Sequence, residues 1–246
     1  MTLICDTVRE AFKSLLPYIR KNLREVIGSV DSNLVKSCLN FIQTFFSEGG
    51  IELKKTTLTN KQLMTYLSFS IIWSLGANLH DKSRSMFGDH MRQVIKKKFP
   101  EFPDGDVYEF GIDRELHKLE PWSEQVPQFH YDNQQSFFEI LVPTSDTVKY
   151  KFVLNTLMNA GYNVLITGET GVGKSVITKD FLGTASEDIV FACVNFSGKT
   201  TTKNLQDAFE GNLESKRKTL LGPPGGKKMI FFIDDVNMPQ LDRYFS

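Results

Sequence analysis

The chain has 246 residues, of which 41% are apolar and 24% charged, so it is long enough for one large domain or two small ones with a buried core. Lys and Arg number 29 and Asp and Glu number 29, and a net charge of zero excludes the basic excess of a protein that coats nucleic acid or an anionic membrane. The most apolar stretch, residues 66–79, is interrupted by Ser and Asn and is shorter than the roughly 18 apolar residues of a membrane span, so we expect neither nucleic acid nor membrane as a partner.

Residues 1–100 are expected to form a helical bundle. Apolar residues recur three and four positions apart from Ile4 to Ile27, which is the period of one helix face, although Pro17 is expected to end or kink the segment near Leu16. Three further helices are predicted. The first begins at Asp31 or Ser32 and stops at Gly49 and Gly50, and the second is capped by Asn60. The third begins at Ser83 and stops before Pro100.

Residues 101–135 are expected to be a linker between two domains. The sequence here changes to Pro, Gly and Asp with isolated aromatic residues, a composition that marks turns. Short strands are predicted at residues 107–112 and 137–142.

From residue 136 to residue 246, helical segments alternate with short apolar runs. A helix is expected to open at Asp146 or Thr147, and Gly161 stands where a left-handed residue ends such a helix. Strands are then predicted at 163–167, 189–195 and 229–233, with helices at 174–182 and 202–218. This alternation predicts a parallel sheet with flanking helices, so the fold class is α/β, with a helical bundle before the sheet.

The strongest motif follows the apolar run at 164–166 and satisfies G-x-x-x-x-G-K-[ST] in full: Gly168, Glu169, Thr170, Gly171, Val172, Gly173, Lys174 and Ser175. Glycines allow successive backbone N–H groups to turn inward around phosphates, and the following helix adds the positive end of its dipole. Lys174 is expected to reach the terminal phosphates, and Ser175 to offer its hydroxyl to Mg²⁺. A plain Gly-rich turn is the alternative.

A second motif, 60 residues beyond the loop, is the apolar run at 229–233 that ends in Asp234 and Asp235. This is the Walker B arrangement, in which Asp234 is expected to hold a magnesium-bound water. Asp235 stands where a glutamate usually orients the attacking water. Because aspartate is one methylene shorter, the sequence favours nucleotide binding more strongly than turnover.

Two further positions are candidates for nucleotide contacts. Asn195 follows the apolar run at 189–195, at the edge where ligands gather in open α/β sheets, and either faces the γ-phosphate or is only a polar strand end. Val142 and Pro143 precede the helix that leads to the loop, and we expect them to line the adenine pocket.

These motifs together resemble dynein heavy chain, the axonemal type most closely. Residues that are similar to the third AAA+ unit of the motor ring are VPTSDTVKY at 142–150, NFS at 195–197, GPP at 222–224 and FIDDVNMP at 232–239. FSIIWSLG at 69–76, with the helices before it, resembles the helical end of the second AAA+ unit. The resemblance covers nearly the whole chain.

The resemblance implies a lid-like helical region at 1–100 from the preceding unit, a linker at 101–135, and an incomplete P-loop AAA+ nucleotide-binding domain at 136–246. It implies ATP or ADP with Mg²⁺ as cofactors, and a regulatory site more than a main hydrolytic one. Neighbouring AAA+ units are the implied direct partners, and intermediate chains, light chains and microtubules are reached through the full assembly. The implied location is the cytoplasm and cytoskeleton, in the axoneme of a cilium or flagellum.

The sequence ends at Ser246, soon after Asp235, so we expect the later strands, sensor residues, Arg finger and lid of the third unit to be absent from this chain. Hydrolysis by this chain alone is therefore not expected. Two alternatives remain open at this stage. One is a stand-alone small P-loop NTPase or kinase whose helical region recognises a substrate, and the other is a non-catalytic scaffold that only retains nucleotide.

Overall fold

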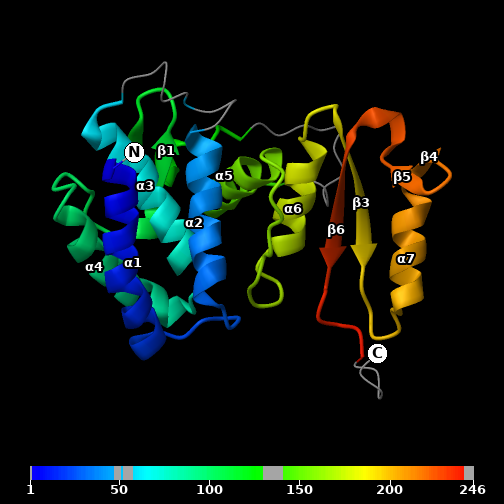
Figure 1. Ribbon diagram of the computed structural model, residues 1–246, viewed down its shortest axis with the longest axis horizontal. Coiled ribbons are helices and arrows are strands. Elements are labelled where there is room, and N and C mark those ends of the chain that lie inside the picture. The colour runs from blue at the N-terminus through cyan, green and yellow to red at the C-terminus, as the bar shows by residue number, and fades with distance from the viewer. Residues whose placement is uncertain (1, 47–50, 52–57, 130–140, 241–246) are drawn as a thin grey trace. The chain divides into compact units, whose positions relative to one another are not determined.

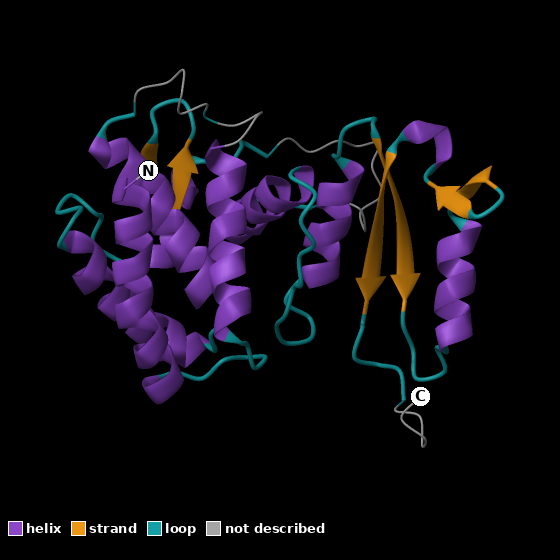
Figure 2. Ribbon diagram, in the orientation of Figure 1, coloured by secondary structure: helices purple, strands orange, loops and turns teal. Residues whose placement is uncertain are grey.

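The computed structural model describes residues 2–46, 51, 58–129 and 141–240. Contacts divide the chain into two compact units, Met1–Ile177 and Thr178–Ser246, which are described separately below. Figure 1 gives the element labels, and Figure 2 shows that helices dominate the first unit. None of the described helices is both long and apolar enough to cross a bilayer.

The first unit is built on the predicted helical bundle. Its helices are α1 (Thr2–Asn22), α2 (Asp31–Phe46), α3 (Asn60–Ile71), the π-helical turn η1 (Ile72–Gly76) and α4 (Asp81–Lys96). Each helix turns an apolar stripe inward, and Phe69 lies at the centre, in ring contact with several other aromatic residues: Phe41, Phe45, Trp73, Trp122 and Phe152. The fold class predicted for this region is confirmed.

The predicted starts of α3 and α4 are wrong, and so is an end of α1 near Pro17, whereas a kink there stays a prediction. Helix α1 continues through Pro17. Proline has no N–H, so the carbonyl oxygen of Lys13 lacks its usual hydrogen bond from residue 17. Both residues lie on the exposed side of the helix, where water can solvate that carbonyl. The cap of α3 is Thr59, whose side chain and that of Gln62 form a capping box. Helix α4 begins two residues before Ser83. The predicted stop at Gly49 and Gly50 lies outside the described residues.

A small hairpin closes the bundle. Its strands β1 (Phe110–Asp113) and β2 (Lys118–Pro121) are antiparallel, and the short helices η2 (Val107–Glu109) and η3 (Trp122–Glu124) flank them. The strand predicted at 107–112 is therefore confirmed only in its second half. Trp122 is fully buried and its Nε1 donates to the carbonyl oxygen of Tyr108 at 2.9 Å, which anchors the hairpin to the core.

Helix α5 (Ser145–Asn159) packs against this same core. Its predicted opening at Asp146 or Thr147 is wrong, because Thr144 caps the helix and Ser145 is its first residue. Phe152 lies against the Trp122 ring, and Lys149 forms ion pairs with Glu109 at 3.1 Å and with Asp146 at 2.8 Å. Burial alone lowers the pKa of Lys149, but the hydrogen bonds and charges of the two carboxylates outweigh it and raise that pKa above its ordinary value. Helix α5 is thus held to the bundle by both apolar and ionic contacts.

The second unit contains the predicted parallel strand pair. Strands β3 (Ile189–Asn195) and β6 (Lys228–Asp234) pair in parallel along their whole length. Helix α7 (Thr202–Gly211) lies beside them in Figure 1, and Phe209 of α7 contacts the ring of Phe231. A hairpin of β4 (Glu214–Arg217) and β5 (Leu220–Gly222) and the short helix η5 (Pro224–Gly226) connect α7 to β6. Helix α6 (Lys174–Gly183) contains the boundary between the two units.

Two predicted elements of the α/β region are wrong. The helix predicted at 202–218 ends at Gly211, because Asn212 caps it by donating from its side chain to the carbonyl of Ala208, and residues 214–217 pair in the β4–β5 hairpin. The run at 163–167 forms no strand, since β3 and β6 pair only with each other among the described strands. The strand predicted at 137–142 lies mostly outside the described residues.

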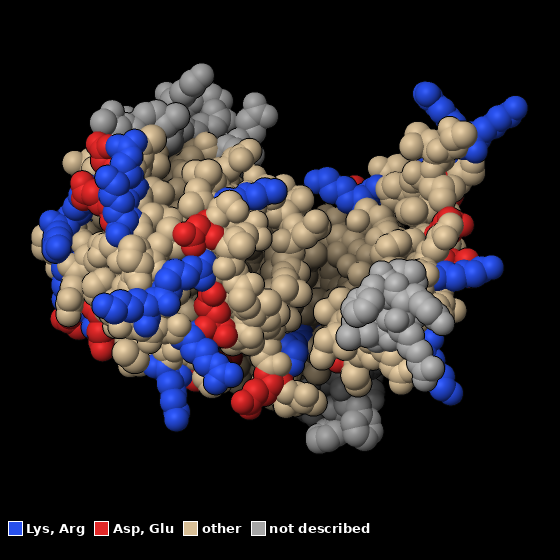
Figure 3. Space-filling model, turned by 60° about the horizontal axis from the view of Figure 1, so that its bottom comes forward, with Lys and Arg blue, Asp and Glu red and all other residues tan. Residues whose placement is uncertain are grey.

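Acidic and basic side chains are interspersed on the face of the first unit shown in Figure 3. Such mixing agrees with the zero net charge of the sequence, which excluded a broadly basic protein.

Candidate nucleotide-binding site

The glycine-rich loop lies between α5 and α6, and all three of its glycines, Gly168 included, have backbone conformations that favour glycine. Gly171 and Gly173 have φ of +85° and +88°. A Cβ added at either position would meet no atom within 4 Å, so conformation and not crowding requires glycine here. The space on the Cβ side of these two residues is therefore open.

Lys174 is the first residue of α6, and its side chain folds back along the loop. Its Nζ donates to the carbonyl oxygens of Gly168 at 3.0 Å and Glu169 at 2.5 Å. The ammonium group is thus held beside the loop that the motif assigns to phosphate. Ser175 is half-buried in the first turn of the same helix, where the helix dipole favours an anion.

Glu169, Thr170 and Val172 lie at the surface of the loop, and Val172 is 59% exposed. Because these side chains lie at the surface, we expect the loop to contact a phosphate through its backbone N–H groups. The loop, Lys174 and Ser175 therefore fit a polyphosphate by the chemistry of their donors.

At the carboxyl ends of the two parallel strands of the second unit, Asn195 and Asp234 are direct partners in the register. Phe196 N donates to the carbonyl oxygen of Asp234 at 3.0 Å, which continues the pairing past Asn195. An amide and a carboxylate thus lie side by side at the edge where ligands bind in parallel sheets.

Asp235 leaves strand β6 with a left-handed backbone, φ +55°. Its N–H donates to Oδ1 of Asp234 at 3.1 Å, and its carbonyl oxygen accepts from Met238 N at 2.9 Å. Aspartate tolerates this conformation better than most residues that carry a side chain, because its short polar side chain can bond locally. The sequence shows the length of this side chain but gives no sign of its left-handed backbone.

Val142 and Pro143 lie in an irregular segment just before α5, and Val142 is 52% exposed. Thr144 fixes the start of α5 through a capping box with Thr147. The capping box therefore fixes the backbone directly after Val142 and Pro143, the residues that the sequence assigns to the adenine pocket.

The described residues contain no group of three or more His, Cys, Asp or Glu side chains able to hold a metal ion. Ser175 of the first unit offers a hydroxyl oxygen, and Asp234 of the second unit offers a carboxylate oxygen. These are the hard ligands that Mg²⁺ prefers, and this ion usually takes few protein ligands and completes its shell with phosphates and water. Each of the two side chains is thus of a kind that fits Mg²⁺ bound together with a nucleotide.

Comparison with known proteins matches both parts of the chain. Residues 4–124 match the family described as dynein heavy chain AAA lid domain, and residues 129–246 match the family described as P-loop containing dynein motor region. The chain is 37% identical to dynein axonemal heavy chain 6 of Homo sapiens over 241 residues, which is 94% of this chain and 6% of that protein.

Other relatives give the same result. The ciliary dynein beta chain of Heliocidaris crassispina is 38% identical over 98% of this chain and 5% of its own length. The flagellar outer arm dynein alpha chain of Chlamydomonas reinhardtii is 30% identical over 98% of this chain and 5% of its own length. This chain thus spans only about a twentieth of these relatives. Since the two family matches adjoin and the relatives align along more than nine-tenths of its residues, the chain belongs to the dynein heavy chain family.

Proposed function

We propose that this chain is the part of an axonemal dynein heavy chain that connects the lid of the second AAA+ unit to the nucleotide-binding region of the third, and that it binds ATP or ADP with Mg²⁺. The observation that carries the proposal is the loop with left-handed Gly171 and Gly173 and with the Lys174 ammonium group held beside it. The expected role is regulation of a microtubule motor. The stand-alone NTPase or kinase is not favoured, because both halves of the chain match dynein families.

In this proposal each site residue has a distinct task. The N–H groups of residues 168–175 bind the phosphates, and Lys174 neutralises their charge. Ser175 and Asp234 hold Mg²⁺, which would supply further neutralisation of the phosphate oxygens. Asn195 orients the terminal phosphate, and Val142 and Pro143 contact the base. Asp235 is the candidate catalytic residue, positioning water.

The proposed partners and location follow from the family. Neighbouring AAA+ units of the same ring would contact this chain directly, and intermediate chains, light chains and microtubules would be reached through the complete motor. The proposed location is the cytoskeleton of the axoneme, in a cilium or flagellum, as the names of the relatives suggest.

A titration with a fluorescent ATP analogue tests the proposed binding. We expect a saturable signal that requires Mg²⁺ and is reversed by unlabelled ATP and by ADP, since the phosphates and the metal are the groups recognised. A signal that excess unlabelled ATP leaves unchanged would contradict a nucleotide site.

In the heavy-chain motor domain, Asp235→Glu is expected to raise ATP turnover at this site by at least about tenfold, because a carboxylate that falls short of its water by 1 Å costs on the order of a hundredfold in rate. The longer side chain in the left-handed conformation should at the same time lower the free energy of unfolding of the second unit by about 1 kcal/mol. Phosphate release and urea unfolding measure the two effects. An unchanged or lower turnover would remove Asp235 from the proposed water-positioning role.

A further inference from the structure

The turn of the β4–β5 hairpin presents a threonine to solvent. Lys218 and Thr219 form this turn between Arg217 and Leu220, which are partners in the register of the two strands. Every residue of β4 is exposed, and so are both residues of the turn. Figure 1 shows the hairpin at the end of α7, to the side of the β3–β6 pair. The Thr219 hydroxyl is therefore accessible to another protein.

Basic residues precede Thr219 in a pattern that one class of enzyme recognises. The three residues directly before it, 216–218, are Lys, Arg and Lys. Among the described residues, no other serine or threonine has a basic residue both two and three positions before it. The same spacing also precedes Thr57, which lies outside the described residues. Many protein kinases select the hydroxyl that they phosphorylate by such a charge pattern, which carboxylates of the kinase match.

The basic side chains before Thr219 are available to an acidic cleft. Arg217 and Lys218 form no ion pair with any residue that the structure describes, so they have no carboxylate to exchange. Lys216 pairs with Glu214, but both side chains are partly exposed. Exposed pairs of this kind add little to stability, so Lys216 can leave Glu214 for a carboxylate of an enzyme at little cost.

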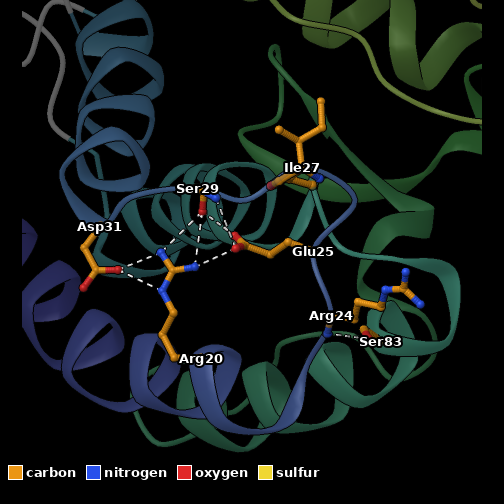
Figure 4. Close-up of polar contacts among 8 residues, drawn as sticks. Arg20, Arg24, Glu25, Ile27, Ser29, Asp31 and Ser83 are labelled. Atoms are coloured by element: carbon orange, nitrogen blue, oxygen red, sulfur yellow. Dashed lines mark hydrogen bonds and ion pairs between the residues drawn. The ribbon is translucent and has the colours of Figure 1, made fainter.

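Ser29 in the helical unit is a contrasting case, because its hydroxyl group is already engaged. Its Oγ accepts from Arg20 and donates to Glu25 (Figure 4). The Arg20 guanidinium group is bound by Glu25 at 2.6 Å and by Asp31 at 2.7 Å, so its charge is not offered to a partner. The Thr219 hydroxyl, by contrast, forms no hydrogen bond within the described parts of the chain.

A kinase cleft holds its substrate in an extended conformation, so the turn of the hairpin must open. Strand β4 has four residues and β5 has three, and a two-stranded hairpin is at best marginally stable by itself. Two of the three residues of β5 are exposed, so the hairpin gives up little apolar contact when it opens. The segment can therefore open locally while α7 and β6 on either side stay folded.

We propose that Thr219 is a phosphorylation site for a protein kinase that selects basic residues two and three positions before its acceptor. Thr219 Oγ1 forms a bond to the γ-phosphorus of the kinase's ATP, the bond from that phosphorus to the β,γ-bridging oxygen breaks, and ADP leaves. The hydroxyl proton passes to the carboxylate base of the kinase. The phosphate, with a charge of about −1.5 to −2 at pH 7, then lies beside Arg217 and Lys218 and neutralises the tip of the hairpin. Nucleotide binding by this chain plays no part in the proposal, so the ATP titration and the experiment below succeed or fail separately.

Phosphorylation of the purified heavy-chain motor domain tests this site. The catalytic subunit of cyclic-AMP-dependent protein kinase, which selects basic residues at these two positions, is added with Mg²⁺ and ATP, and mass spectrometry locates the phosphate. The internal control is the exposed Thr184, which has no basic residue at positions 180–183 and whose hydroxyl donates to the carbonyl oxygen of Phe181 at 3.0 Å. We expect the occupancy of Thr219 to exceed that of Thr184 by at least about tenfold. Equal occupancy of the two residues, or no phosphate on Thr219, would overturn the proposal.

Arg217→Gln in the same motor domain tests whether the charge pattern directs the kinase. The change removes one of the two selected charges and leaves the exposed turn in place, so we expect the initial rate at Thr219 to fall by at least about tenfold. Lys227→Gln is the matched control, because Lys227 is an exposed basic residue in the same connection between α7 and β6 but follows the acceptor. Its rate should stay within about twofold of the unchanged protein. Thermal melting of each protein shows whether it is folded, and equal rates in the two variants would contradict the proposed recognition.

Discussion

Replacing Lys174 with alanine is expected to weaken ATP binding by about 100-fold or more, as measured by titration with a fluorescent analogue. Hydrogen bonds from a charged group are worth about 1.5–3 kcal/mol each, and about 3 kcal/mol corresponds to roughly 100-fold in affinity. The change also removes the two hydrogen bonds from Nζ to the carbonyl oxygens of Gly168 and Glu169, which hold the loop in its conformation. Both effects act in the same direction.

Lys179→Ala is the matched control for this prediction. Lys179 lies on the same helix α6, carries the same charge and is exposed. Its removal is expected to leave the affinity for ATP within about twofold, because long-range attraction between exposed charges is screened by salt. A similar loss in both variants would show that general charge, and not the position of the Lys174 ammonium group, determines binding.

The phosphate loop is the part of the site that a sequence predicts best, because its geometry is local. Glycines at positions 171 and 173 are required by the left-handed backbone of the same two residues, and Lys174 and Ser175 follow directly in the helix. The left-handed conformation of Asp235, by contrast, is not predicted by a local sequence motif. It arises from the hydrogen bonds of the turn that follows β6, and no periodicity in the sequence reports those bonds.

Two of the wrong predictions, those at 163–167 and at Pro17, share a physical cause, since each judged a segment without its surroundings. An apolar run such as 163–167 becomes a strand only when a second strand satisfies its backbone N–H and C=O groups. Residues 189–195 have such a partner in β6, and their predicted strand is confirmed with the same bounds. In the same way, Pro17 ends a helix only where the lost hydrogen bond cannot be replaced by water.

Helix α5 shows a further limit of sequence reasoning. The family match assigns residues 129–246 to the P-loop region, yet Phe152 and Lys149 of α5 pack on the helical bundle. The period of α5 predicts a helix but does not say which domain its apolar side faces. The expected boundaries at residues 100 and 135 stay predictions, whereas the packing of α5 depends on the aromatic core around Trp122.

Trp122→Ala is expected to lower the free energy of unfolding of the helical unit by about 3–5 kcal/mol, the usual range for removing a buried tryptophan. Trp122 is fully buried between Phe69 and Phe152, and its Nε1 satisfies the carbonyl oxygen of Tyr108. Urea unfolding followed by circular dichroism measures the change. Trp122→Phe keeps most of the ring contacts and loses the hydrogen bond, so it should cost only about 1–3 kcal/mol.

A double-mutant cycle with Gly111 distinguishes lost packing from general damage. A Cβ at Gly111 would overlap the ring of Trp122, so Gly111→Ala alone should cost about 1–3 kcal/mol through overpacking. In the Trp122→Ala protein the ring is gone and the added methyl group enters the space it leaves, so the same Gly111→Ala change should cost close to nothing. Strictly additive losses would mean that the two residues do not contact one another in the folded protein, and the proposed role of Trp122 in anchoring the hairpin would be wrong.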